Sequence, residues 1–203
     1  MRAAASVIAA ISVLAYPLVV YYGLANGSAR FAGVALLAVL VPVLVVRLWR
    51  ASKETRLTVL ALPLTVIALV GLSVMLNDRV FLLLLPTLIN SAMLAQFGRT
   101  LFRGPPMVER FARLVEPDLS SEKVGYCRTV TQIWCAFFAL NGATAMVLAM
   151  SASLQVWSFY TGIVNYVIMG ALFAGEYFVR KVRFRTYSNA FHDRVFAALF
   201  PPP

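Results

Sequence analysis

The feature that most constrains this chain is a series of six long apolar runs that contain almost no charged residue. They cover roughly residues 3–25, 31–46, 57–76, 80–97, 130–150 and 156–179. Most of these runs are near the ~20 residues that a helix needs to cross the hydrocarbon core of a bilayer. None shows the alternating pattern of a membrane-spanning strand. The runs therefore predict an all-α membrane protein, a bundle of six transmembrane helices.

The composition argues against a soluble domain. Hydrophobic residues make up 61% of the chain and charged residues only 13%, whereas soluble domains carry about 25% charged residues. The first run is longer than the ~7–15 apolar residues of a secretion signal, so we expect it to be retained. Cys127 and Cys135 lack metal-binding spacing, and no nucleotide or catalytic motif is present. We therefore expect a non-enzymatic protein without metal or cofactor.

The basic residues indicate how the bundle is oriented. With the amino terminus in the cytoplasm, all but two of the 18 lysines and arginines fall on cytoplasmic segments, the exceptions being Arg30 and Arg79. Such a bias follows the positive-inside rule and predicts that both termini are cytoplasmic. The net charge of +10 then faces anionic lipid headgroups. Nucleic acid is not an expected partner.

The chain divides into four regions by hydropathy and charge. Residues 1–97 hold four transmembrane helices, and residues 98–126 form a cytoplasmic loop with a short interfacial helix. Residues 127–182 hold the last two transmembrane helices, and residues 183–203 form a basic tail that ends in a short amphipathic helix. Asp118 or Ser120 is expected to cap the fifth transmembrane helix.

The interfacial helix is predicted over residues 105–117, between two proline positions. Its apolar residues share one helical face, and its charged residues share the other. The apolar set is Met107, Val108, Phe111, Leu114 and Val115, and the charged set is Glu109, Arg110, Arg113 and Glu116. This pattern is typical of a helix that lies in the membrane interface. It serves either as a simple connection between two spans or as a docking surface.

Four polar residues lie within the apolar runs and are candidates for an intramembrane site: Asn90, Asn141, Asn165 and Glu176. The asparagines either line a polar path for a substrate or join helices by hydrogen bonds. Glu176 precedes Arg180 by four residues, so it is either a paired interfacial carboxylate or a functional acid in the membrane.

Mostly small or polar residues form a stripe along one helical face of the fifth run, and a second stripe follows the sixth run. The first stripe consists of Thr131, Cys135, Phe138, Gly142, Ala145 and Ala149. Such faces let helices approach closely, which predicts that the last two spans pack as an antiparallel hairpin. A second candidate site is a basic surface for a partner or for lipid headgroups, formed by Arg103, Arg110, Arg113, Arg180, Lys181 and Arg183.

Three stretches within residues 97–183 resemble a family of small bacterial inner-membrane proteins encoded in aryl-polyene (xanthomonadin-type) pigment clusters. They read GRTLFRGPPMVERFARLVEPDL, YCRTVTQIWCAFFALNGATA and GEYFVRKVRF. The same region is distantly similar to intracellular septation protein A. The positions that carry this second similarity are Arg128, Trp134, Ala136, Phe137, Phe138, Asn141 and Gly142.

The resemblance implies a multi-pass protein of the bacterial inner membrane that supports assembly or export of a lipid-linked product such as an aryl-polyene pigment. Its expected partners are membrane lipids, acyl-carrier or acyltransferase proteins, and further copies of itself as a homo-oligomer. Two alternatives stay open. One is a small transporter or flippase component, and the other is a cell-envelope or septation factor.

Overall fold

The computed structural model describes residues 16–50 and 56–185, and these residues are almost entirely helical. Residues 16–26 form the first described helix. The helices that follow are α2 (Ala29–Arg50), α3 (Arg56–Leu76), α4 (Val80–Leu83), α5 (Leu85–Phe102), α6 (Met107–Arg113), α7 (Ser121–Ser151), α8 (Leu154–Phe159), the π-helical turn η1 (Tyr160–Val164) and α9 (Asn165–Phe184). The described residues contain no strand, which agrees with the predicted all-α class.

Three helical stretches of the described residues are long and apolar enough to cross a membrane. They are Val80–Phe102, Ser121–Ser151 and Leu154–Phe184. The helices α2 and α3 contribute shorter apolar stretches, Ala29–Pro42 and Pro63–Leu76. The described part of the chain thus has the character of a membrane protein. The first part of the run at 3–25 and the amphipathic helix expected in the tail lie outside the described residues.

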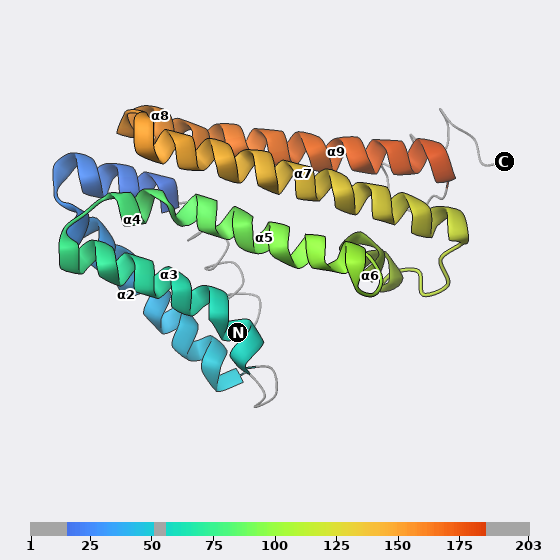
Figure 1. Cartoon of the computed structure of the whole chain (residues 1–203), viewed down its shortest axis with the longest axis horizontal. Coiled ribbons are helices and arrows are strands. Elements are labelled where there is room, and N and C mark those ends of the chain that lie inside the picture. The colour runs from blue at the N-terminus through green and yellow to red at the C-terminus, as the bar shows by residue number, and fades with distance from the viewer. Residues whose placement is uncertain (1–15, 51–55, 186–203) are drawn as a thin grey trace, which may run out of the picture. The chain divides into compact units, whose positions relative to one another are not determined.

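The chain forms two compact units, residues 1–163 and residues 164–203. Within the first unit, α2 packs along α3 and α5 packs along α7 (Figure 1). Its core joins residues from the helix at 16–26, from α2 to α5, from α7 and from α8. The buried members are Val20, Ala32, Leu36, Val70, Leu82, Leu83, Leu85, Ala149 and Trp157. The second unit contains α9.

The small-residue face of α7 is covered by α5. Gly142 lies so close to Asn90 of α5 that a Cβ added at Gly142 would stand 3.0 Å from the Asn90 Cβ. Further along the same two helices, the rings of Phe97 and Phe138 meet edge to face with centroids 5.1 Å apart. The sequence identified this face of α7 but assigned it a different partner, because small residues on α5 give no comparable stripe.

Residues 77–79 form a turn between α3 and α4, and Asn77 and Asp78 each suit it for a local reason. Asn77 has a left-handed backbone, with φ of 50°, which asparagine tolerates better than most residues. The Asp78 carboxylate accepts a hydrogen bond at 2.9 Å from the N–H of Val80, the first residue of α4. The turn therefore reverses the chain between α3 and α4.

The fourth apolar run is broken just before Pro86, at Leu84, which lies between the end of α4 and the start of α5. The sequence predicts one continuous helix over 80–97 with a proline inside. Proline has no N–H for the carbonyl four residues earlier and its ring clashes there, so the helix divides at Leu84. The continuous helix α5 then extends to Phe102, beyond the predicted boundary at residue 97.

The next connection spans residues 103–120 and is shorter than the predicted loop at 98–126. Ser120, one of the two residues predicted to cap this helix, is the N-cap of α7. Its hydroxyl accepts a hydrogen bond from the Lys123 N–H at 3.4 Å. Within the connection, α6 covers only Met107–Arg113, instead of 105–117, because Leu114 and Val115 already form a turn.

Candidate functional site

A chain of hydrogen bonds runs through the interior of the first unit and joins two of the predicted site residues. The Tyr160 hydroxyl donates to Asn141 Oδ1 at 2.9 Å. Asn141 Nδ2 donates to Asn90 Oδ1 at 3.0 Å, and Asn90 Nδ2 donates to the Pro86 carbonyl at 2.8 Å. Asn90 and Asn141 are both buried. These hydrogen bonds link η1, α7 and α5 at a single level.

The close approach of α5 and α7 is what places the two asparagines in contact. Gly142 presents no side chain toward Asn90, and Thr87 donates its hydroxyl proton to the Gly142 carbonyl at 3.3 Å. Thr87 lies on α5 close to Asn90. Its hydrogen bond to α7 therefore reinforces the pairing of the two asparagine amides. The sequence identified the asparagines from their apolar surroundings but not Tyr160, because tyrosine is common at the ends of membrane helices.

A second polar layer surrounds the break in the fourth run. Pro86 cannot donate to the Leu82 carbonyl, and the Tyr16 hydroxyl donates to that carbonyl instead. The Leu83 carbonyl accepts the indole N–H of Trp157 at 3.1 Å. In a bilayer such carbonyls need partners from neighbouring helices. Sequence analysis missed Tyr16 and Trp157 as partners, although Pro86 signalled that a carbonyl would need one.

The chain enters η1 next to this layer. Ser158 donates its hydroxyl proton to the Pro17 carbonyl at 3.2 Å, and Thr161 donates to the Trp157 carbonyl at 2.8 Å. A Cβ added at Gly162 would stand 3.3 Å from the Pro17 Cβ. The π-helical turn therefore lies where this segment packs closely against the helix at 16–26. No buried side-chain nitrogen or oxygen among the described residues lacks a hydrogen-bond partner.

The other two predicted intramembrane residues, Asn165 and Glu176, lie on α9 in the second unit. Glu176 Oε1 is 3.6 Å from Arg180 Nε, an ion pair across one helical turn. This is the pairing predicted from their spacing. The ammonium of Lys181 lies 5.5 Å from the centroid of the Tyr177 ring. Asn165 is the first residue of α9.

The connection between α5 and α7 is fastened to both helices by threonine hydroxyls. The Met107 N–H donates to Thr100 Oγ1 at 2.9 Å, and the Val108 N–H donates to Thr131 Oγ1 at 3.3 Å. Both threonines are buried. Because the first N–H groups of a helix have no partner within it, these two contacts hold the start of α6 in place. Neither threonine could be assigned this role from the sequence.

The charged face of α6 differs from the prediction. Glu109 was expected to face away from the bundle, but it is buried and its carboxylate lies 2.7 Å from the Arg113 guanidinium. Arg113 also donates to the Pro117 carbonyl at 2.8 Å. The ion pair neutralises the buried carboxylate, so this face of α6 can pack against the protein. Glu109 and Arg113 are four residues apart, a favourable spacing for an ion pair on a helix.

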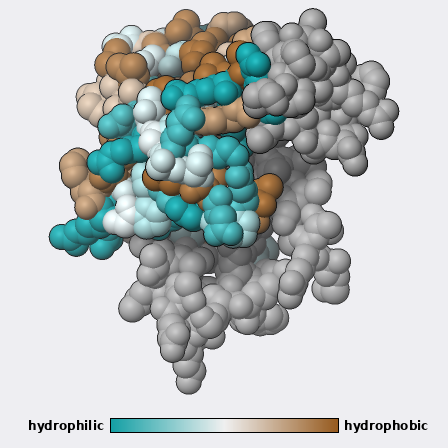
Figure 2. Space-filling view, turned by 90° about the vertical axis from the view of Figure 1, so that its right-hand side faces the viewer, coloured by the Kyte–Doolittle hydropathy of each residue, from teal (hydrophilic) through white to brown (hydrophobic). Residues whose placement is uncertain are grey.

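The predicted apolar face of α6 is divided in two. Met107 and Val108 are half-buried, whereas Phe111, Leu114 and Val115 are exposed. Figure 2 views the end of the molecule that carries this connection. Both hydrophilic and hydrophobic residues lie on the described part of this surface.

The predicted basic surface lies on two separate units. Arg103, Arg110 and Arg113 belong to the connection around α6, and all three are exposed. Arg110 Nε donates to the Pro105 carbonyl at 2.9 Å. The other three members, Arg180, Lys181 and Arg183, lie near the end of α9.

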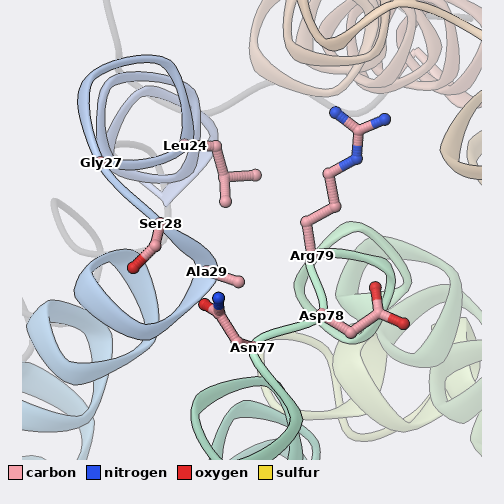
Figure 3. Close-up of a pocket in the computed structure, with 7 residues that line it drawn as sticks. All are labelled: Leu24, Gly27, Ser28, Ala29, Asn77, Asp78 and Arg79. Carbon is pink, nitrogen blue, oxygen red and sulfur yellow. The ribbon is translucent and has the colours of Figure 1, made fainter.

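A shallow pocket that the sequence did not predict lies between the turn at 27–28 and the turn at 77–79. Its volume is 580 Å³, and it is lined by Leu24, Gly27, Ser28, Ala29, Asn77, Asp78 and Arg79. Figure 3 shows the Arg79 side chain extending along the side of the pocket opposite Leu24, while the Asp78 carboxylate points away from the pocket. The Asn77 amide oxygen accepts a hydrogen bond from the Arg30 N–H at 3.2 Å.

Two features of the described residues thus bear on function. One is the interior, where every buried side-chain nitrogen and oxygen has a hydrogen-bond partner. The other is the exposed connection around α6. No group of three or more His, Cys, Asp or Glu residues in the described part of the chain is placed to hold a metal ion. Comparison of the chain with models of protein families, with curated proteins and with solved structures found no match.

Proposed function

We propose that this chain is a non-enzymatic accessory protein of the bacterial inner membrane that supports assembly of a lipid-linked product. In this proposal it crosses the membrane six times with both termini in the cytoplasm. Three stretches that are long and apolar enough to cross a membrane support the setting, and the distribution of arginine and lysine supports the orientation.

The observation that carries the proposal is the contrast between the interior and the surface of the protein. Inside the first unit, the amides of Asn90 and Asn141 are hydrogen-bonded to each other, to Tyr160 and to the Pro86 carbonyl. Polar groups that bond one another in this way join helices. The basic surfaces, in contrast, carry exposed guanidinium groups that a partner can reach.

The aryl-polyene pigment as product rests on the sequence resemblance of residues 97–183. Acyl-carrier and acyltransferase proteins would assemble such a product at the cytoplasmic face. An acidic surface on these partners would be attracted to the basic end of α9, which carries Arg180, Lys181 and Arg183. Complementary charge raises the rate of such encounters and selects the partner.

A deletion strain tests the proposal when inner and outer membranes are separated and pigment and lipid are profiled in each. We expect the product to be absent from both fractions and to return with the wild-type chain. The double substitution Lys181→Glu with Arg183→Glu should not restore it. The matched control is Arg79→Glu, a charge reversal on the opposite side of the membrane, which should restore it fully.

A lipid-moving role is the second candidate, and the interrupted helices favour it. Transporters often use discontinuous helices near the middle of the bilayer, and here α4 and α5 divide at Pro86 while η1 interrupts the last stretch. In that case the deletion strain would accumulate finished product in the inner membrane. If neither fraction changed, the pigment link would be wrong and the septation alternative would be preferred.

A further inference from the structure

Four large apolar side chains in and beside the connection around α6 are exposed. Phe102 is 88% exposed, Leu114 81% and Val115 89%, and Phe111 is 57% exposed. The carboxylate of Glu109 faces inward at the same place. A helix on a water-facing surface has the opposite arrangement, with its apolar side inward and its charges outward. This surface therefore suits surroundings that are themselves apolar.

The hydrogen bonds of α6 fix its depth along the two helices that hold it. Thr100 directly follows Arg99, the first charged residue after the apolar stretch of α5, and Thr131 lies three residues inside Arg128 of α7. From 129 to 151, α7 carries no charge and is about 34 Å long at 1.5 Å per residue. A stretch of that length fills the hydrocarbon core of ~30 Å. The start of α6 is thus fastened at the edge of the bilayer.

The charges beside the apolar side chains match the phosphate groups found at that depth. Arg103 and Arg110 are exposed, and the guanidinium of Arg103 has no hydrogen bond or ion pair with any residue that the structure describes. Guanidinium groups bind phosphate oxygens in a bidentate manner. A second copy of the chain would be a poor occupant, because a twofold contact through this surface would bring arginines opposite arginines.

We infer that Phe102, Phe111, Leu114 and Val115 are inserted in the headgroup region of the cytoplasmic leaflet, with Arg103 and Arg110 bound to anionic phospholipid. The apolar side chains reach the start of the acyl chains, and the two guanidinium groups contact phosphates. The assignment to the cytoplasmic leaflet rests on the proposed function. The contact with lipid does not, and it is tested on purified protein without any product.

The first test measures the depth of residue 114. Full-length Leu114→Trp and Asp118→Trp proteins are reconstituted in phosphatidylcholine–phosphatidylglycerol vesicles, and the emission of the native tryptophans is subtracted. Asp118 is exposed in the same connection and serves as the control. We expect lipid brominated near the headgroup to quench the fluorescence of the indole at 114 at least about threefold more than that of the indole at 118. Aqueous iodide should quench the indole at 118 more than the indole at 114.

Two results of this test would overturn the inference. Iodide quenching at 114 as strong as at 118 would place the apolar surface in water. Protection of residue 114 from both quenchers would show that protein covers the surface, either a second copy or a partner. Because neither result depends on pigment, failure of this inference leaves the proposed function standing, and an unaltered deletion strain leaves this inference standing.

The second test measures the preference for anionic lipid. The ratio of spin-labelled phosphatidylglycerol to phosphatidylcholine bound at the protein surface is compared between the wild type and Arg103→Gln with Arg110→Gln. Each basic residue near an anionic membrane contributes about 1 kcal/mol, or about fivefold, so the local preference should fall about fivefold per arginine. Arg79→Gln at the opposite end should leave it unchanged. An unchanged ratio in the double variant would overturn the assignment of the phosphates.

Discussion

The Asn141 side chain connects three separate segments, which are α5, η1 and its own helix α7. It accepts from Tyr160 and donates to Asn90, so one amide holds η1 and α5 against α7. Interhelical hydrogen bonds in membranes average ≈ 0.6 kcal/mol when measured singly. Leaving a buried donor or acceptor without a partner costs about 1–3 kcal/mol. The second effect dominates here, because losing Asn141 strands a group on each neighbour.

We predict that Asn141→Leu lowers the free energy of unfolding by about 1–3 kcal/mol. Gln132→Leu is the control, since Gln132 is an exposed amide on the same helix, and it should change stability by less than about 0.5 kcal/mol. Unfolding of the purified proteins in mixed micelles with increasing sodium dodecyl sulfate measures both. Equal effects of the two substitutions would show that the interior chain of hydrogen bonds does not hold the helices together.

The Tyr16 hydroxyl has a role that depends on another residue, Pro86. It bonds the Leu82 carbonyl, which an ordinary residue at position 86 would reach with its own N–H. We therefore predict that Tyr16→Phe destabilises the wild type by about 1 kcal/mol but has a smaller effect in a Pro86→Ala background. A double-mutant cycle measures the coupling.

Tyr22→Phe is the control for this cycle, because Tyr22 is an exposed tyrosine on the same helix. Its effect should be small and independent of the residue at position 86. If Tyr16→Phe cost the same in both backgrounds, its hydroxyl would not be replacing the missing proline N–H.

At the scale of helices, the approach of α5 to α7 depends on the absence of a side chain at Gly142. A Cβ there would stand 3.0 Å from the Asn90 Cβ and 3.9 Å from the Thr87 carbonyl oxygen. Overpacking of this kind costs typically 1–3 kcal/mol. It would also push apart the two helices that bring Asn90 and Asn141 together.

We predict opposite signs for two glycine-to-alanine substitutions on α7. Gly142→Ala should lower the free energy of unfolding by about 1–3 kcal/mol. Gly125→Ala should leave it unchanged or raise it by up to ~1 kcal/mol, because no atom lies within 4 Å of an added Cβ there and alanine is the better helix former. Unfolding in mixed micelles gives both values, and stabilisation by Gly142→Ala would contradict the close contact.

The helices themselves were largely predictable from the sequence, because each apolar run carries its own signal. The cap at Ser120, the turn at Asn77-Asp78-Arg79 and the ion pair of Glu176 with Arg180 depend on residues a few positions apart. Such local contacts follow from spacing alone. The topology predicted from them remains a prediction.

The contacts between helices were not predictable, because their partners are far apart in the sequence. Trp157 bonds the carbonyl of Leu83, which precedes it by 74 residues, and no pattern in either segment names the other. Glu109 was predicted to lie on the outward, charged face of α6 but is buried, for a related reason. The sequence assigns each helical face as polar or apolar from the types of its residues. It does not show that the pairing with Arg113 allows the Glu109 carboxylate to be buried.

At the scale of the whole molecule, the orientation depends on the sum of many weak preferences. Each arginine or lysine on the cytoplasmic side contributes a small electrostatic term, and only the combined bias sets the topology. Two exposed residues report on it directly. Arg79 precedes the stretch Val80–Phe102 and Asp118 follows it, so they should lie on opposite sides of the membrane.

We predict that a membrane-impermeant thiol reagent applied to intact spheroplasts labels Arg79→Cys but not Asp118→Cys, in a background where Cys127 and Cys135 are replaced by alanine. Detergent permeabilisation should make Asp118→Cys reactive, which controls for its exposure. Labelling of Asp118→Cys alone would reverse the orientation and place the α6 surface against the outer leaflet. Labelling of both from outside would mean that Val80–Phe102 does not cross the bilayer, because a single spanning helix must put its two ends in different compartments.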